Sequence, residues 1–300
     1  MTSRTRNSCD FDAAGLDMSQ GLAGPPLRPR ARHVRVVSAK VRKLVILSSI
    51  TTAVLLSSQR ADAATILWVG HCGDAPGYPT IQGAINAANA GDTVKVCPGI
   101  YVENVTINKV SLTVVSTGGA GVTRILAAQV ASVVSITQPN ASLVGFTLVP
   151  VASVAKYDIG VNVNIGGNAS AEIAHNVIRG GRIGVNLGCA SSGSTVYHNV
   201  VRGSSEAGIN IDTCEVPGPP YQGSTFNSVH HNAVCGGLFP YSIAAGDGSH
   251  FNDVHHNTGK WISIYGNGNI VHNNTAQLFN IVPGNPANVA FNNTVAAVCP

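Results

Sequence analysis

One short phrase recurs along the C-terminal half of the chain and limits what the chain can fold into. The pattern Ile/Val-x-His/Phe-Asn occurs six times, with copies that begin at Ile173, Val196, Val229, Val254, Ile270 and Val289. The starts lie 23, 33, 25, 16 and 19 residues apart. Repetition of one short unit at such a period indicates a solenoid, in which each unit stacks on the next.

A second phrase, rich in β-branched residues, recurs between these copies. It reads Gly160–Val163, Gly184–Leu187 and Gly208–Ile211, with Asn at each third position. The alternation of apolar and polar residues predicts strands with Val, Ile and Leu inside and Asn outside. The repeat is too short for a strand-helix-strand unit, which favours an all-β fold made of the coils of a parallel β-helix.

The Asn that ends each copy of the first phrase is expected at a sharp turn. Asn tolerates the left-handed backbone conformation, and stacked coils let its amide bond to the Asn above and below. The His before it forms a row, and a linear row does not converge on a point as metal ligands must. We therefore predict no metal site. His230 and His255, one place earlier, are expected to face the other way as a surface pair.

Residues 1–63 are predicted to be an export leader. A basic pair at 42–43 precedes an apolar run from Leu44 to Leu56, and residues 61–63 form an A-x-A cleavage motif. The run is too short to span a bilayer. We expect cleavage near Ala63/Ala64, no stable membrane span afterwards, and a mature protein that is secreted or held in the cell envelope.

Positive charge is concentrated in this leader. Residues 1–63 hold ten of the 18 Lys and Arg, so residues 64–300 carry eight basic and ten acidic residues, a net charge of −2. No basic patch remains, and nucleic acid is not expected as a partner. Low charge with many β-branched residues fits a solenoid with an aliphatic interior and a neutral surface, which we expect to be monomeric.

Export makes the six cysteines after the leader candidates for disulfides. Cys189 and Cys214 end successive strands of the second phrase, so stacking brings them to bridging distance. Cys72 and Cys97 flank the first expected helix and strand, and we predict a bridge between them as well. The pairing of Cys235 with Cys299 stays open, because these residues lie about three coils apart, ~14 Å at the spacing of neighbouring strands.

The segment from Pro79 to Ile107 carries a more specific signal. It opens with Pro79-Thr80-Ile81-Gln82, passes through Gly91-Asp92-Thr93-Val94, and continues to Cys97-Pro98-Gly99-Ile100-Tyr101-Val102-Glu103. This phrase resembles the opening of the pectin-lyase-like superfamily. The resemblance implies a right-handed parallel β-helix over residues 64–300, with a short N-terminal capping helix at 79–91 and coils from 92 to 300.

The enzymes of this superfamily use acidic residues, which are scarce here. The aspartate segments of pectin methylesterases are missing, whereas Asn210-Ile211-Asp212 resembles the Asn-x-Asp of polygalacturonase-like hydrolases, and Asp247 is the acid of the next coil. A lyase would need an Arg to take the proton, for which Arg182 is the candidate, and Ca²⁺ as its ion. The catalytic candidates are Asp212, Asp247 and Arg182, and no cofactor is expected unless the protein is a lyase.

The polar positions of the second phrase point outward on one sheet. Ser263 and Tyr265 are expected to continue this face, and Tyr221 lies in the long insertion after it. Amides, a carboxylate and aromatic rings are groups that hold sugars. The predicted carbohydrate-binding residues are Asn162, Asn186, Asn210, Asp212, Tyr221 and Tyr265.

These features predict a protein that contacts extracellular polysaccharide along one exposed sheet, without efficient catalysis. One alternative is a polysaccharide lyase or glycoside hydrolase that acts on glycans containing uronic acids. A second alternative is a purely structural or adhesive surface protein.

Overall fold

A computed structural model describes residues 63–72, 76–151, 159–163, 170–188, 191–211, 223–235, 241–284 and 286–299. Residues 1–62 of the predicted leader lie outside these ranges, and so do Cys189, Asp212, Cys214 and Tyr221. The described residues form β-strands and one helix, α1 (Ile81–Ala87). The named strands pair in parallel throughout.

Ten strands form one sheet, called sheet A here. In order, they are β1 (Ile66–Val69), β2 (Thr93–Val96), β5 (Thr113–Ser116), β8 (Ala141–Val144), β11 (Ala171–Ala174), β14 (Thr195–Tyr197), β17 (Ser228–His230), β20 (Asp253–His255), β22 (Ile270–His272) and β24 (Val289–Phe291).

The other fifteen strands form sheet B, which is made of two stacks. The first stack contains β3 (Gly99–Val102), β6 (Thr123–Leu126), β9 (Thr147–Val149), β12 (Val177–Arg179), β15 (Val200–Arg202) and β18 (Ala233–Cys235). The second stack contains β4 (Val105–Ile107), β7 (Val134–Ile136), β10 (Ile159–Val163), β13 (Ile183–Leu187), β16 (Ala207–Ile211) and β19 (Tyr241–Ala245). The long strand β21 (Thr258–Ile264) pairs with both β18 and β19, and β23 (Thr275–Ile281) and β25 (Thr294–Val295) follow it.

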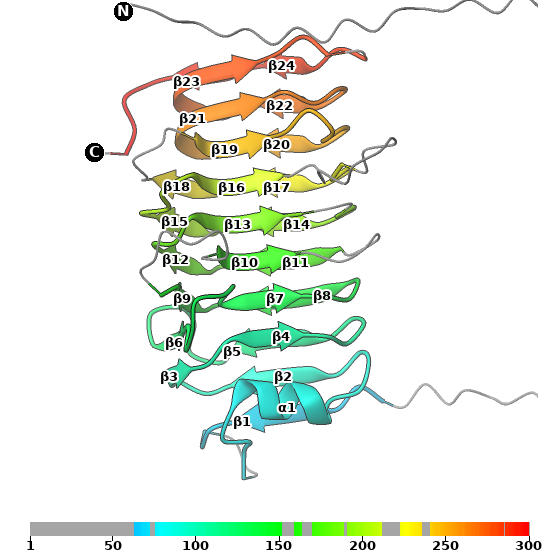
Figure 1. The fold of residues 1–300 in the computed structure, drawn as a ribbon, viewed down its shortest axis with the longest axis vertical. Coiled ribbons are helices and arrows are strands. Elements are labelled where there is room, and N and C mark those ends of the chain that lie inside the picture. The colour runs from blue at the N-terminus through cyan, green and yellow to red at the C-terminus, as the bar shows by residue number, and fades with distance from the viewer. Residues whose placement is uncertain are drawn as a thin grey trace, which may run out of the picture. The chain divides into compact units, whose positions relative to one another are not determined.

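The chain visits sheet A, the first stack and the second stack in turn, and then begins the next coil (Figure 1). Six coils, from β2–β4 to β17–β19, contribute three strands each. From β20 onward each coil has two strands, because β21 and β23 run along both parts of sheet B. This is a parallel β-helix, as the repeats predict.

Aliphatic side chains fill the interior in rows that follow the coils. One row joins Val161, Val185, Ile209, Ile243 and Ile262, which are neighbours in register and 0% exposed. Burial of each such side chain stabilises the fold by about 1.5–3 kcal/mol. Close packing also explains the Gly that opens the second phrase, because a Cβ on Gly184 would lie 2.4 Å from Val201 Cγ1.

The turns at the ends of sheet A combine a left-handed residue with a buried Asn. At the ends of β11, β14, β17 and β20 the left-handed residue is a histidine, with φ between 53° and 56° at His175, His198, His231 and His256. The following Asn is at most 2% exposed and points inward. The left-handed conformation predicted for Asn therefore belongs in these turns to the residue before it.

The inward Asn side chains form the amide ladder that the sequence predicted. From Asn199 onward each Oδ1 accepts from the backbone N and from Nδ2 of the Asn one coil earlier, at 2.9–3.1 Å. Each Nδ2 also donates to a carbonyl of the preceding coil, as from Asn199 to Ile173 O at 2.8 Å. This inner column consists of Asn176, Asn199, Asn232, Asn257, Asn274 and Asn293.

The last two steps of the inner column correct the register read from the sequence. The column runs through Asn274 and Asn293, whereas the fifth and sixth copies of the phrase end in Asn273 and Asn292. Two Asn residues follow each other in both copies, so the sequence allows two registers. Strand pairing selects the second, in which His272 lies beside His255.

A second inner column lies at the other end of the sheet A strands. Its members are Asn227, Asn252, Asn269 and Asn288, joined by Nδ2-to-Oδ1 hydrogen bonds of 3.0–3.1 Å. The residues before the first three also have positive φ, from 56° to 64°. The sequence did not reveal this column because no common residue precedes its Asn members. The preceding residues are Phe226, Phe251 and Gly268.

Helix α1 packs at the N-terminal end of the solenoid, beside β1, β2 and β4 (Figure 1). It is shorter than the predicted segment 79–91. Thr80 caps it by accepting from Gly83 N at 3.1 Å, and both carboxylate oxygens of Glu103 accept from its first-turn amides at 2.9 Å. Its residues Ile81, Ala84 and Ile85 are buried.

Two disulfides fasten the described chain. Cys72 is bridged to Cys97, the pair that the sequence predicts, and Cys235 is bridged to Cys299, the pair that it leaves open. The second bridge requires the tail after β25 to return toward β18, and Gln277 Nε2 holds this tail by donating to Val298 O at 2.8 Å. Both residues of the predicted pair Cys189–Cys214 lie outside the described residues.

Across the residues that the structure describes, no helix has the length and apolar character needed to cross a membrane.

Candidate functional site

The outer face of the second stack carries a column of amide side chains. Asn162, Asn186 and Asn210 are neighbours in register on β10, β13 and β16. Asn186 Nδ2 donates to Asn162 Oδ1 at 3.1 Å, and Asn210 Nδ2 donates to Asn186 Oδ1 at 3.0 Å. Asn162 and Asn210 are half-buried, while Asn186 is 8% exposed. This outer column holds three predicted site residues in one fixed orientation.

The same register continues toward the C-terminal coils. It passes through Ala244 and Ser263 to Asn280 on β23. Asn280 Nδ2 donates to Ser263 Oγ at 3.1 Å and to Tyr265 Oη at 3.0 Å. Ser263 and Tyr265 thus continue the face as predicted. Asn280 is a member that the sequence did not reveal, because β23 lacks the Gly-Val/Ile-Asn phrase.

Aromatic rings lie at the C-terminal end of this face. Tyr241 shares a side-chain hydrogen bond with Tyr265, and its ring centroid lies 4.9 Å from that of Trp261. Burial and this hydrogen bond raise the pKa of Tyr241, so its phenol is a neutral group at neutral pH. Tyr265 remains 39% exposed. The face therefore combines amides, hydroxyls and at least one accessible ring.

Most of the acidic residues in the described part of the chain have structural roles. Asp92 accepts from two backbone amides at 2.7 Å, Glu103 caps α1, and Glu172 accepts from Ser142 and Tyr197. Glu206 pairs with Arg182, and Asp253 Oδ1 lies 3.2 Å from His272 Nε2. Asp247, the sixth, is exposed in the turn after β19. Among the described residues, no three acidic side chains gather into the cluster that Ca²⁺ binding requires.

Two of the three predicted catalytic residues, Arg182 and Asp247, are not brought together by the fold. Arg182 precedes β13 and Asp247 follows β19, at opposite ends of strands in the second stack. A five-residue strand spans about 17 Å, so these two side chains flank the face instead of meeting on it. Arg182 lies against Glu206, and Asp212 is outside the described residues.

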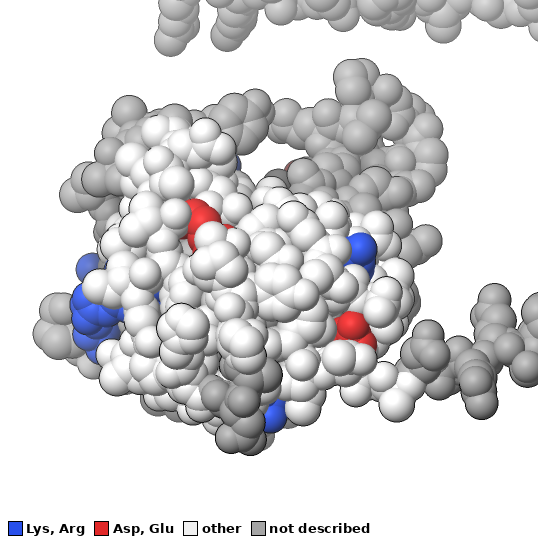
Figure 2. All heavy atoms as spheres, turned by 90° about the horizontal axis from the view of Figure 1, so that it is seen from below, with Lys and Arg blue, Asp and Glu red and all other residues white. Residues whose placement is uncertain are grey.

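Other charges on the described surface are few. Arg179 and Arg202 are exposed neighbours in register on the first stack, away from the outer column. Figure 2 shows the molecule from below, where most of the visible described surface carries neither acidic nor basic side chains.

A different arrangement occupies the outer face of sheet A, where imidazole rings form two columns. The strand column contains Tyr197, His230, His255, His272 and Phe291, with neighbouring ring centroids 4.8–5.2 Å apart. The turn column contains His175, His198, His231 and His256, with centroids 4.8–5.2 Å apart.

The two columns stand side by side, which corrects the prediction that His230 and His255 face the other way. His230 Nδ1 lies 3.0 Å from His231 Nδ1, and His255 Nδ1 lies 2.9 Å from His256 Nδ1. The left-handed backbone of the turn residue turns its side chain to the same outer side as the residue before it.

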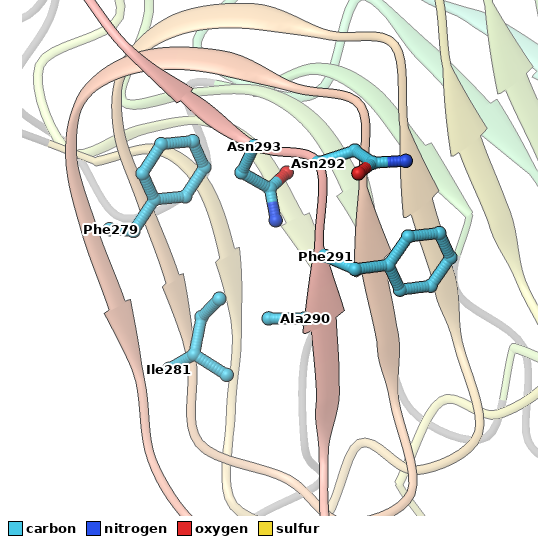
Figure 3. A pocket seen from close by; sticks show the side chains of 6 residues that line it. All are labelled: Phe279, Ile281, Ala290, Phe291, Asn292 and Asn293. Carbon is cyan, nitrogen blue, oxygen red and sulfur yellow. The ribbon is translucent and has the colours of Figure 1, made fainter.

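A cavity of about 350 Å³ opens at the C-terminal end of the described coils. Phe279, Ile281, Ala290, Phe291, Asn292 and Asn293 line it, as Figure 3 shows. Phe279 and Ile281 also pack against the interior of the solenoid. The cavity is thus the end of the solenoid interior, and it lacks the polar groups of the outer column.

The sequence of the chain matches no protein-family profile and no curated protein. Its structure is similar to that of an alginate lyase from Paenibacillus sp. str. FPU-7, with a TM-score of 0.56 and 13% identity over 71% of this chain and 76% of the lyase. A pectin methylesterase from Aspergillus niger gives a TM-score of 0.46 and 13% identity over 80% of this chain and 87% of that enzyme. At a sequence identity this low, structural similarity indicates a shared fold and not a shared activity. The chain thus shares the parallel β-helix fold of the alginate lyase.

Proposed function

We propose that this protein is exported and contacts neutral extracellular polysaccharide along the outer face of the second stack. The observation that carries the proposal is the pair of polar groups on one outer register, with Ala244 between them. The first is the outer column of Asn162, Asn186 and Asn210, and the second consists of Asn280 and Tyr265. Ordered amides can donate to and accept from sugar hydroxyls, and an exposed ring can pack on the apolar face of a sugar.

Neutral chains suit this face better than acidic ones. Arg182, the basic residue that the sequence places near it, lies against Glu206, and residues 64–300 have a net charge of −2. A shallow face with few anchors binds weakly, so we expect dissociation constants from about 1 mM down to the high micromolar range.

The proposal includes the absence of efficient turnover. Its support is the structural use of five of the six described acids and the separation of Arg182 from Asp247. A lyase or hydrolase acting on uronic-acid glycans, and a purely structural or adhesive protein, are the alternatives that the experiment below distinguishes.

Export and the details of the fold belong to the same proposal. The apolar run and the A-x-A motif support cleavage near Ala63/Ala64, and two disulfides suit an oxidising compartment. We take α1 as the cap of the N-terminal end and the winding as right-handed, as nearly all parallel crossovers are. N-terminal sequencing that found residues 1–40 on the exported protein would refute the leader.

The test is a glycan array followed by calorimetry on the exported protein, with neutral and uronic-acid polysaccharides. We expect binding to neutral chains that weakens several-fold in Asn210→Ala, Tyr221→Ala and Tyr265→Ala. Ser228→Ala, on the outer face of sheet A, is the matched control and should bind as the unmodified protein does. Absence of binding would refute the proposal, and release of unsaturated products or reducing ends would establish an enzyme instead.

A further inference from the structure

The paired imidazole columns of sheet A bring ring nitrogens of consecutive residues close together. Packing of surface histidines does not by itself require this close approach. Parallel pairing repeats each column at the spacing of neighbouring strands, and the left-handed turn sets one column against the other. Ring nitrogens of consecutive residues therefore meet at 2.9 and 3.0 Å, once per coil.

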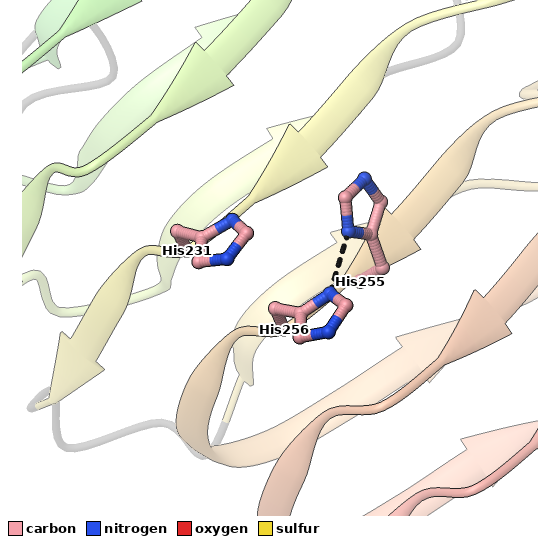
Figure 4. A group of neighbouring side chains, drawn as sticks. All are labelled: His231, His255 and His256. Carbon is pink, nitrogen blue, oxygen red and sulfur yellow. Dashed lines mark hydrogen bonds between the residues drawn. The ribbon is translucent and has the colours of Figure 1, made fainter.

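We propose that His255 and His256, joined by His231 of the preceding coil, bind a divalent transition-metal ion of the class that prefers imidazole ligands. One ligand nitrogen from each of these three residues lies within 4.8 Å of the other two. Figure 4 shows the three rings together, with the Nδ1 atoms of His255 and His256 directed at each other. Zn²⁺, Ni²⁺ and Cu²⁺ are the ions that imidazole suits.

The distances fit such an ion after a small rearrangement. Two nitrogens at ~2.1 Å from one tetrahedral ion lie about 3.4 Å apart, close to the spacing of the two Nδ1 atoms in each pair. The nitrogen of His231 must approach by rotation of its side chain. His231 and His256 are exposed and can rotate, while His255 is half-buried and stacked between His230 and His272.

Binding would replace the proton shared by the two Nδ1 atoms. In the structure, one ring of each pair must donate this proton and the other must accept it. An ion that binds both Nδ1 atoms requires this proton to move to Nε2 of the same ring, so both rings stay neutral and no net proton is released. Three protein ligands leave a fourth position open to water, which is typical of accessible zinc sites.

Equivalent positions in neighbouring coils show which substitutions the fold tolerates at His255 and His256. At the level of His256, the next coil has Asn273 with φ 55°, so His256→Asn keeps the left-handed turn. In the strand column, Phe291 stacks on His272 with centroids 4.8 Å apart, so His255→Phe keeps a ring in the stack. His175→Asn, at the far end of the turn column, is the matched control.

The experiment is calorimetric titration of the chelator-stripped full protein, purified without a polyhistidine tag, with ZnCl₂, NiCl₂ and CuCl₂. We expect saturable binding of at least one of these ions. The double variant His255→Phe/His256→Asn should lose at least tenfold in affinity, whereas His175→Asn should stay within twofold of the unmodified protein.

Three results would overturn the site. They are no binding of any of the three ions, equal affinity in the double variant, or an equal loss in His175→Asn. If the double variant does not fold, electron paramagnetic resonance of the Cu²⁺-loaded unmodified protein decides the question. Hyperfine coupling to imidazole nitrogen would support the site, and its absence would exclude it.

Discussion

The same side chain forms two kinds of column in this molecule, one on each side of the solenoid wall. The inner column is buried from Asn176 to Asn274, and its amides satisfy backbone groups as well as each other. The outer column of Asn162, Asn186 and Asn210 lies on the outer face. The hydrogen bonds that join its members run between side chains.

The difference shows what sets the contribution of an amide ladder to stability. That contribution depends on which polar groups lose their hydrogen-bond partner when the amide is removed. From β11 onward every position of the inner column is Asn, with Phe146 in this place one coil earlier. The outer register passes from Asn210 to Ala244 without interruption of the strands. A buried backbone N–H needs a partner, but a half-exposed amide can exchange its partner for water.

The largest effect should come from Asn232→Ala in the inner column. The substitution removes the acceptor of Asn199 N and the donor to Val196 O, both buried, and leaves a small cavity. Each buried unsatisfied group costs about 1–3 kcal/mol, so we expect a loss of about 3–5 kcal/mol in the free energy of unfolding. Chemical denaturation measures it. A loss below that of the outer-column variant would break the comparison.

The next largest effect is expected in the double variant Cys72→Ser/Cys97→Ser. This bridge lies outside both Asn columns, so its loss gives a reference for the loss of stability in Asn232→Ala. The bridge closes a segment with a sequence separation of 25 residues. The chain-entropy model gives about 3 kcal/mol for such a loop, through the unfolded state. We expect denaturation and proteolysis to begin near α1. Unchanged stability, or free thiols in the purified protein, would contradict this.

A smaller effect is expected from Asn210→Ala in the outer column, where the side chain is half-buried. The variant loses its hydrogen bond to Asn186 and no backbone partner. We expect a cost of about 1 kcal/mol by denaturation, together with weaker glycan binding. A cost equal to that of Asn232→Ala would mean that burial does not distinguish the two columns.

The smallest effect should come from His231→Asn, directly beside the inner column but on the outside of the wall. The residue keeps its left-handed backbone, which Asn adopts readily and which Asn273 adopts in this chain. We expect a change within about 0.5 kcal/mol in thermal or chemical unfolding without added metal. A larger loss would show that imidazole stacking itself supports the turn.

The architecture could be predicted from the sequence because each repeat independently indicates the same stacked coil. The spaced Asn phrase and the alternating Gly-Val-Asn-Val strands both require stacked parallel coils, and the structure has them. The assignment of single residues was less secure. Asn273-Asn274 and Asn292-Asn293 offer two registers, and only pairing across coils separates them.

The outer surface could be predicted only in part for the same physical reason. Period-two alternation placed Asn186, Asn210 and Ser263 on one face correctly, because all lie within regular strands. It failed at His231 and His256, where one left-handed residue reverses the alternation. Contacts between coils, such as Arg182 with Glu206, depend on loop lengths that no local pattern encodes.

The Cys235–Cys299 bridge has a consequence for how the molecule comes apart. In a solenoid, each coil is held mainly by its nearest neighbours, so an end can fray one coil at a time. Here a link across 64 residues of sequence ties the tail after β25 to β18. Release of the final coil is then coupled to the coils of β19–β24 in between. The terminal segment should therefore exchange its amide hydrogens as one cooperative block while the bridge is intact, and coil by coil after reduction.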